Sequence, residues 1–159
     1  MSYEWLSGRD HVLKRPDTYV GPVSTTNIKG HVFDDSCEGQ ISTNEVECTT
    51  SPALFKLFDE VIVNAIDNSK RCKQKYIKAK LNENGQFSIS NDGDTIPIKH
   101  WEGLDPPRYV PEILVYELMS GENFSDDRNK VGGRNGLGVK IVNLLSKEFS
   151  IDIINVEYG

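Results

Sequence analysis

Hydrophobic side chains recur along the chain with two different periods, and the longer period predicts three helices. From Ala53 to about Lys73 the apolar positions follow helical spacing, directly after Ser51-Pro52, which supplies a cap and a proline at the first helical position. The same spacing predicts a second helix over Pro111–Ser120 and a third that begins at Gly136 or Gly138 and runs to Lys147.

Strict alternation of apolar and polar residues predicts the strands. Tyr76–Leu81 and Phe87–Ser90 flank Asn84-Gly85, a dipeptide that favours the tight turn of a β-hairpin. Residues 30–50 alternate in the same way, with breaks at Asp, Ser and Gly, and predict another hairpin. Phe149–Val156 also alternates, which predicts a further strand near the end of the chain.

The N-terminal part is predicted to be an arm over residues 1–14 that leads into a short helix, followed by a turn at Arg15–Gly21. No repeat or low-complexity linker divides the sequence, so residues 1–159 are interpreted as one domain. Helices and strand pairs in this order predict the α+β class. The expected architecture is a two-layer α/β sandwich, in which helices cover one face of a mixed, mostly antiparallel sheet.

Composition restricts the class of protein without deciding its function. With 37% hydrophobic and 26% charged residues the sequence is typical of a globular domain, and no apolar run approaches the roughly 18–20 residues that span a bilayer. Met1–Arg15 is too polar for a signal peptide, and the scattered cysteines and histidines predict neither disulfides nor a zinc site. We therefore expect a soluble intracellular protein that does not associate with a membrane.

The net charge of −6 does not suit a DNA-binding surface, because affinity for phosphates rests on clustered lysine and arginine. If the protein acts on DNA, other regions or other chains must hold it. One basic run is nevertheless present, at Lys70, Arg71, Lys73, Lys75, Lys78 and Lys80. A solvated helix end and strand face is the first interpretation of this run, and a surface that faces DNA is the alternative.

The first candidate for chemistry is a polar stripe on the longest predicted helix. Glu60, Asn64 and Asn68 follow one another at four-residue spacing, with Asp67 beside them, while the other faces are apolar. A solvated outer face is the usual reason for such a stripe. Buried carboxylate and amide groups, in contrast, require partners, which makes a ligand site the alternative.

A second candidate, Asn91-Asp92-Gly93, follows a predicted strand directly, where a short acceptor side chain can reach the edge of a planar ligand. Taken alone, this tripeptide is a routine turn. A third candidate has four glycines within residues 132–138, immediately before a helical pattern, which predicts an anion-binding helix N-terminus with cationic donors at Arg134 and Lys140. A flexible linker is the alternative.

The third candidate matches neither of two familiar phosphate loops. No Gly-Lys-Ser/Thr follows the glycines, as a Walker A loop requires, and Ile141 occupies the third glycine position of a dinucleotide fingerprint. The three candidates together resemble the GHKL ATPases, whose Glu-x-x-x-Asn box is present as Glu60-Val-Ile-Val-Asn64 and whose glycine boxes match residues 91–95 and 132–138.

Longer strings narrow the resemblance to type IIA DNA topoisomerases of the eukaryotic kind, including viral relatives. These strings are Arg15–Gly21, Leu54–Ala65 and Gly132–Lys140, and the resemblance extends over nearly the whole chain. It implies the Bergerat (GHKL) ATP-binding fold, with the N-terminal ATPase domain incomplete at its C-terminus and the transducer domain absent. A fragment of this kind is expected to bind nucleotide weakly and to hydrolyse it poorly, since the family's catalytic lysine lies in the transducer.

The resemblance also assigns roles to individual residues. It implies that Glu60 is the general base for the attacking water, that Asn64 is a ligand of Mg²⁺, and that Asn91 contacts adenine. Tyr3 is expected to reach the nucleotide of the partner subunit, and the polar loop before the third helix is expected to act as an ATP lid. The full set of implied ATP contacts is Asn64, Asn68, Asn91, Gly121, Glu122, Asn123, Gly133, Arg134, Asn135, Gly136, Leu137, Gly138, Val139 and Lys140.

At the level of the whole protein, the resemblance implies that binding of ATP with Mg²⁺ dimerises the N-terminal domains and traps a DNA segment for strand passage. The expected location is the nucleus for a cellular protein, and the host nucleus or cytoplasm for a viral one. Other clamp ATPases of the chaperone or MutL type, and a non-catalytic interaction module with a degenerate pocket, remain alternatives. Two departures from the family pattern are Thr95, expected to be strained in place of a glycine, and Gly121-Glu122 in place of serines.

Overall fold

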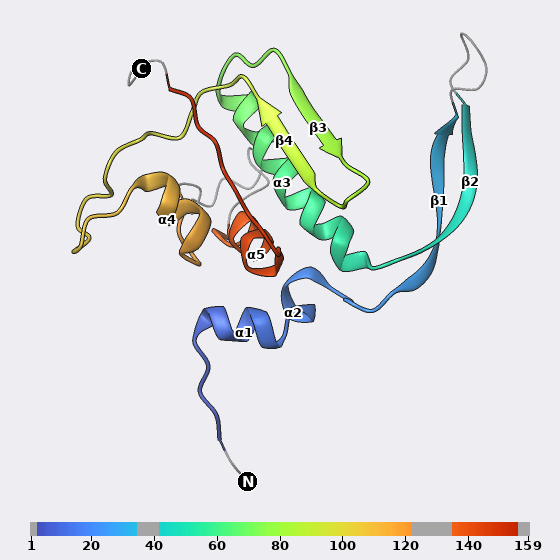
Figure 1. The fold of residues 1–159 in the computed structure, drawn as a ribbon, viewed down its shortest axis with the longest axis horizontal. Helices are drawn as coiled ribbons and strands as arrows, with labels where there is room; N and C mark the ends of the chain where they lie inside the picture. Colours follow the sequence, from blue (N-terminus) through green and yellow to red (C-terminus); the bar gives the residue numbers. More distant parts are fainter. Residues whose placement is uncertain (1–2, 35–41, 122–134, 156–159) are drawn as a thin grey trace.

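The computed structural model of the chain describes residues 3–34, 42–121 and 135–155, which contain both helices and antiparallel strands (Figure 1). In chain order the elements are α1 (Gly8–Lys14), α2 (Asp17–Val20), β1 (Thr26–Asp34), β2 (Ser42–Thr50), α3 (Pro52–Arg71), β3 (Ile77–Leu81), β4 (Phe87–Asn91), α4 (Val110–Tyr116) and α5 (Gly138–Leu145). The predicted α+β class is confirmed.

Helix α3 is the longest element and forms where its period predicts. Ser51 precedes it in an extended conformation and Pro52 is its first residue, as expected for a helix start. The helix ends at Arg71, because Cys72 is extended. One side of α3 packs against the β3–β4 hairpin, where the rings of Phe58 and Phe87 lie 4.5 Å apart.

Both predicted hairpins form. β3 and β4 pair antiparallel from Ile77↔Asn91 to Leu81↔Phe87, with Gly85 in the turn at a φ of 82°. β1 and β2 pair antiparallel from Thr26↔Thr50 to Asp34↔Ser42, so this hairpin begins earlier than the predicted residue 30. Figure 1 shows β1–β2 standing apart from the helices, whereas β3–β4 lies along α3.

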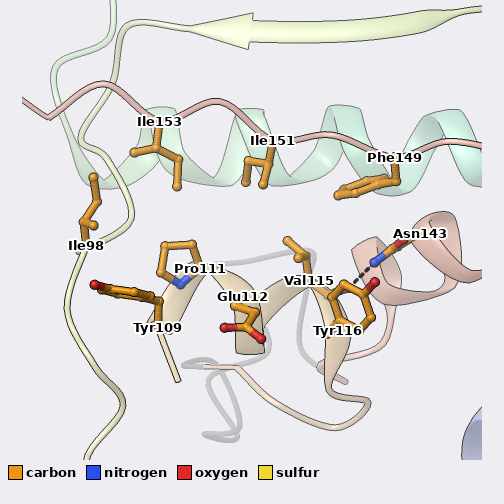
Figure 2. Close-up of a pocket in the computed structure, with 10 residues that line it drawn as sticks. All are labelled: Ile98, Tyr109, Pro111, Glu112, Val115, Tyr116, Asn143, Phe149, Ile151 and Ile153. Atoms are coloured by element: carbon orange, nitrogen blue, oxygen red, sulfur yellow. Dashed lines mark hydrogen bonds between the residues drawn. The ribbon is translucent and has the colours of Figure 1, made fainter. Parts of the chain in front are cut away.

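The predicted strand at Phe149–Val156 is wrong over residues 149–155, and Val156 lies outside the described residues. A strand requires a partner for its backbone groups, and within the described part of the chain β1–β2 and β3–β4 are separate two-stranded sheets. The expected single mixed sheet is therefore not formed there. The alternation has another cause: Phe149, Ile151 and Ile153 all line one cavity, so their spacing places them on the same side of an irregular segment (Figure 2).

Helix α4 is shorter than the predicted Pro111–Ser120. It ends at Tyr116, and Met119 in the following turn has a left-handed φ of 63°. The hydroxyl of Ser120 lies 3.1 Å from the carbonyl oxygen of Ile113 and 2.8 Å from that of Glu117. The single hydroxyl proton of Ser120 is thus shared between two carbonyls near the end of the helix, which ends one turn earlier than predicted.

The hydrophobic core joins the two N-terminal helices to α3 and α5. Val12 from α1, Val20 from α2, Ala53 from α3 and Ile141 from α5 are buried together. Leu137, the residue before α5, packs against this cluster and fixes the start of that helix. The predicted short N-terminal helix is α1, and the predicted turn at Arg15–Gly21 contains the single-turn helix α2. Within the described residues, no helix is long and apolar enough to cross a membrane.

Candidate functional site

The carboxylate of Glu60 lies against the first residue of α5. A Cβ at Gly138 would collide with Oε2 of Glu60 and would lie 3.0 Å from its Cδ. The side chain of Glu60 is 23% exposed, so it stands at the edge of the packed α3–α5 contact. The carboxylate of the Glu-x-x-x-Asn box and the glycine-rich helix start, which are distant in the sequence, therefore meet in space.

Lys56 also contacts Glu60. Its Nζ lies 2.6 Å from Oε1 of Glu60, one turn away on α3, and 3.6 Å from Oδ2 of Asp59. The hydrogen bond with Glu60 raises the pKa of Lys56 above its ordinary value. The two oxygens of Glu60 are thus divided between the ammonium of Lys56 and the backbone of Gly138. Sequence reasoning missed Lys56, although its four-residue spacing from Glu60 is a pattern that predicts an ion pair.

Asn64 lies one turn beyond Glu60 and is exposed. Its Nδ2 donates to the carbonyl oxygen of Glu60 at 2.8 Å, so Oδ1 is the amide atom that faces away from this bond and can coordinate a cation. Mg²⁺ prefers oxygen ligands and commonly takes a few from the protein and the rest from phosphate and water. In the described part of the chain, no group of three His, Cys, Asp or Glu side chains could hold a metal. The residues present fit a cation that is held jointly by Asn64 and a phosphate.

The polar positions Glu60, Asn64 and Asn68 form a stripe along α3. The turn at residues 91–93, the Asn91 turn, lies at the end of this stripe that is far from Glu60. Nδ2 of Asn68 is 3.3 Å from Oδ1 of Asn91 and 3.0 Å from the carbonyl oxygen of Asp94. The N–H of Gly93 also donates to Oδ1 of Asn91, at 3.1 Å. Because Glu60 and Asn68 are two turns apart, about 12 Å of helix separates the carboxylate end of the site from the turn.

Gly93 is required by packing. A Cβ at this position would lie 2.6 Å from Nδ2 of Asn68, 2.7 Å from Oε1 of Gln74 and 2.8 Å from Sγ of Cys72. The expected strain at Thr95 is wrong, because in the described residues Met119 alone among non-glycine residues has a positive φ. The turn needs a glycine for close approach at Gly93, and it does not need a left-handed residue at position 95.

Glycines lie at the start of α5 and just before it. Gly136 adopts a φ of 59°, and its carbonyl oxygen accepts a hydrogen bond from the N–H of Met119 at 2.9 Å. Asn135 is exposed, whereas Val139 is partly buried. The N–H groups of the first helical turn have no partner within the helix, which makes this end suitable for an anion.

Lys140 occupies a different environment from the one its sequence position suggests. It is 4% exposed, and its Nζ donates to the carbonyl oxygen of Ser120 at 2.5 Å. Burial lowers the pKa of Lys140 below its ordinary value. The ammonium therefore binds the segment next to Gly121, which is partly buried, and links it to α5.

One predicted contact in the described residues is not joined to this arrangement. Tyr3 is 96% exposed on the N-terminal segment. Glu122, Asn123, Gly133 and Arg134 lie outside the described residues, as does the predicted lid.

A cavity of about 450 Å³ between α4 and residues 149–153 is a separate feature (Figure 2). Its walls are mainly apolar, and none of its lining residues belongs to the predicted nucleotide contacts: Ile98, Tyr109, Pro111, Glu112, Val115, Tyr116, Asn143, Phe149, Ile151 and Ile153.

Comparison with known families decides what kind of domain carries this arrangement. Residues 49–157 match the family described as "Histidine kinase-, DNA gyrase B-, and HSP90-like ATPase". The chain belongs to this ATPase family. The match begins just before α3 and extends past α5, so it includes both helices that meet at Glu60 and Gly138.

Relatives in sequence have one name in common. The chain is 38% identical over 161 residues to DNA topoisomerase 2 of Candida albicans and 38% identical over 162 residues to that of Saccharomyces cerevisiae, in both cases with 99% of this chain covered. It is 37% identical over 159 residues to human DNA topoisomerase 2-alpha, with 98% covered. The chain spans only about a tenth of these relatives, 11% of the yeast proteins and 10% of the human one.

Solved structures agree with this ATPase fold. The ATPase region of Saccharomyces cerevisiae topoisomerase II matches with a TM-score of 0.79 at 37% identity, over 89% of this chain and 37% of that one. The ATPase and transducer domains of DNA topoisomerase II from Balamuthia mandrillaris match with a TM-score of 0.78 at 38% identity, over 89% of this chain and 35% of that one.

Proposed function

We propose that this chain binds and hydrolyses ATP to drive dimerisation of the N-terminal gate and DNA strand passage in a type II DNA topoisomerase. The observation that carries the proposal is the contact between the carboxylate of Glu60 and Gly138 at the N-terminus of α5. It sets a potential base beside a potential phosphate site. The similarity to eukaryotic DNA topoisomerase 2 over almost the whole chain supports the choice within the family.

Hydrolysis requires a base next to the terminal phosphate. The N-terminus of α5 attracts phosphate through its free N–H groups and the helix dipole. Glu60, which contacts this helix end, then accepts a proton from the water that attacks the γ-phosphate. Lys56, at 2.6 Å from Oε1, holds the carboxylate in place on the side away from Gly138.

The remaining roles are divided between the two ends of the α3 stripe, one for the phosphates and one for the base. Asn64 offers Oδ1 to Mg²⁺, which neutralises charge on the phosphates when it is bound. Asn91 contacts the base at the other end of the stripe, and residues 135–140 surround the triphosphate. For Lys140 this role requires its ammonium to leave the carbonyl of Ser120, or to act on the nucleotide through that segment.

DNA and a second subunit are the proposed partners. The net charge of −6 indicates that most contacts with DNA come from outside residues 1–159. The almost fully exposed Tyr3 is available to reach the nucleotide of a partner subunit. Because the substrate is DNA, we propose the nucleus as the place of action in a eukaryotic cell, and the host nucleus or cytoplasm if the protein is viral.

The alternatives are less well supported. A chaperone-type or MutL-type clamp would share the nucleotide site, but the relatives described above are DNA topoisomerases. In a non-catalytic interaction module with a degenerate pocket, no function would require the contact between Glu60 and the glycine-rich helix start.

The experiment is the replacement Glu60→Gln in the full-length protein, with Glu83→Gln in the β3–β4 turn as the matched control. Glu60→Gln should abolish ATP turnover and DNA strand passage while a non-hydrolysable ATP analogue still binds. Glu83 is exposed and stands outside the proposed site, so its variant should keep both activities. Normal turnover by Glu60→Gln would contradict the proposal, and so would a wild-type protein that binds no ATP.

A further inference from the structure

The β3–β4 hairpin turns one face to α3 and the other away from it (Figure 1). On the inner face, the ring of Phe87 contacts that of Phe58 on α3. Because side chains alternate along a strand, the neighbours of Phe87 on β4 point the other way. The register of the two strands then places four exposed residues together on the outer face, here called the lysine-rich face: Lys78, Lys80, Ser88 and Ser90.

No carboxylate neutralises the lysines of this face, since each of them lies opposite a serine. On the β1–β2 hairpin, in contrast, Lys29 lies opposite Glu47, and its Nζ is 3.5 Å from Oε1 of Glu47 and 3.3 Å from Oε1 of Glu45. Within the described part of the chain, neither Lys78 nor Lys80 forms an ion pair. Two like charges about 7 Å apart on one strand therefore stay uncompensated.

The start of β3 fixes the position of this face. Oδ1 of Asp92 accepts the N–H groups of Lys75 and Tyr76, so this nearby carboxylate is engaged by backbone. Nζ of Lys78 lies 4.6 Å from the centroid of the Tyr76 ring, where the attraction between a cation and an aromatic face favours it. The ammonium of Lys78 is thus kept beside an exposed tyrosine on the outer side of the hairpin.

The groups on the lysine-rich face are those that contact phosphate in protein–DNA complexes. Lysine ammonium groups and serine and tyrosine hydroxyls all donate to phosphate oxygens there. None of the four residues lines the cavity between α4 and residues 149–153 (Figure 2). An open face with a row of donors fits a long polyanion with repeated charges better than it fits one small anion.

We propose that the lysine-rich face of β3–β4 binds the phosphate backbone of duplex DNA without reading its sequence. This inference rests on the proposed function, which names DNA as a partner, and it gives one of the DNA contacts to this chain. It also narrows the basic run of residues 70–80 to the two lysines that share a face with hydroxyl donors. The net charge of −6 is no obstacle, because the acidic residues lie elsewhere than on this face.

The first measurement is the rate of lysine acetylation in the full-length protein, read for each residue by mass spectrometry, with and without duplex DNA. Bound DNA should slow the acetylation of Lys78 and Lys80 and leave that of exposed Lys29 unchanged. Rates at Lys78 and Lys80 that do not respond to DNA would overturn the proposal. Polyglutamate at equal charge is the comparison. If it protects these lysines as well as DNA does, the face binds acidic protein and the proposal is wrong.

The second measurement is the salt dependence of DNA affinity in the double variant Lys78→Gln with Lys80→Gln. The control, Lys29→Gln with Lys99→Gln, removes the same charge from exposed positions elsewhere. Loss of two phosphate contacts should lower the slope of log affinity against log salt concentration by about 2, while the control keeps the wild-type slope. An unchanged slope would refute the proposal. It is the result expected if the lysines only protect a strand edge from pairing.

Basal ATP turnover separates this inference from the proposed function. Without DNA, both double variants should hydrolyse ATP at the wild-type rate, because none of the four lysines belongs to the proposed nucleotide contacts. If wild type hydrolyses ATP and the DNA measurements are negative, the lysine-rich face is refuted while the proposed function stands. If wild type hydrolyses no ATP, the proposed function fails and the DNA measurements still decide the face. Should the Lys78→Gln, Lys80→Gln variant not fold, acetylation of the wild-type protein gives the answer.

Discussion

Glu60 and Gly138 are in direct contact, with the carboxylate against a backbone position that has no room for a Cβ. Gly138→Ala should therefore push the carboxylate aside while the fold survives, because the atom displaced first is the end of a side chain. Misplacement of a catalytic group predicts a fall of about a hundredfold in kcat. Steady-state ATP hydrolysis measures this.

Gly30→Ala is the control for this prediction. A Cβ at Gly30 would meet nothing within 4 Å, and its φ is not positive. The control variant should hydrolyse ATP at the wild-type rate. Equal kcat for Gly138→Ala and wild type would show that the contact has no part in the reaction.

Lys56 should tune the activity of Glu60 only modestly. The pair is partly exposed, at 45% for the lysine and 23% for the glutamate side chain, so solvent and salt screen it. Lys56→Met should lower kcat by no more than about fivefold, change the free energy of unfolding by less than about 1 kcal/mol, and lose its effect in high salt. Lys29→Met, which removes exposed ion pairs with Glu45 and Glu47 on the β1–β2 hairpin, should leave kcat unchanged at every salt concentration. A salt-independent loss of activity in Lys56→Met would contradict this account.

Lys140 should make stability depend on pH in the alkaline range. Burial lowers the pKa of Lys140 below the ordinary value of 10.5 that applies to the unfolded chain. Between these two pKa values the unfolded state binds more protons, so the stability of the folded state rises with pH. Urea unfolding of wild type and Lys140→Met at pH 7 and near pH 10.5 tests this. Between the two pH values, the free energy of unfolding of wild type should increase relative to that of the variant. A constant difference between the two proteins would refute it.

Asp92 should contribute stability that is lost in acid. Its Oδ1 accepts the N–H groups of Lys75 and Tyr76, at 2.8 and 3.0 Å, and the bond from Tyr76 is the main cause that lowers the pKa of Asp92. A lowered carboxyl pKa means that this stability is present above the ordinary value of 3.8 and disappears as pH falls below it. The free energy of unfolding of Asp92→Asn should change less between pH 6 and pH 3 than that of wild type. Identical dependence on pH in the two proteins would rule the role out.

Local signals in the sequence predicted the elements that local forces decide. Ser51-Pro52 and the apolar period fixed the start of α3, and Asn84-Gly85 fixed the β3–β4 turn. The alternation at residues 149–155 was misread, because alternation reports only which residues share one side of a segment. It does not report whether a partner strand is present.

The site could be predicted from the sequence where a short motif has a specific chemical role. The Glu60–Asn64 box and the glycines of α5 identified the two parts that meet, and their meeting is confirmed. The links at Cys72 and Lys140 were missed, because a thiol facing Asp94 and an ammonium bound to Ser120 depend on how distant segments pack. Neither residue has a sequence spacing that points to its partner.

The most direct test of the central claim is a structure of the full-length protein with a non-hydrolysable ATP analogue and Mg²⁺. The account predicts the γ-phosphate between Glu60 and the backbone of Gly138, the metal on Oδ1 of Asn64, and the base at Asn91. A nucleotide bound elsewhere, for example in the cavity between α4 and residues 149–153, would contradict it.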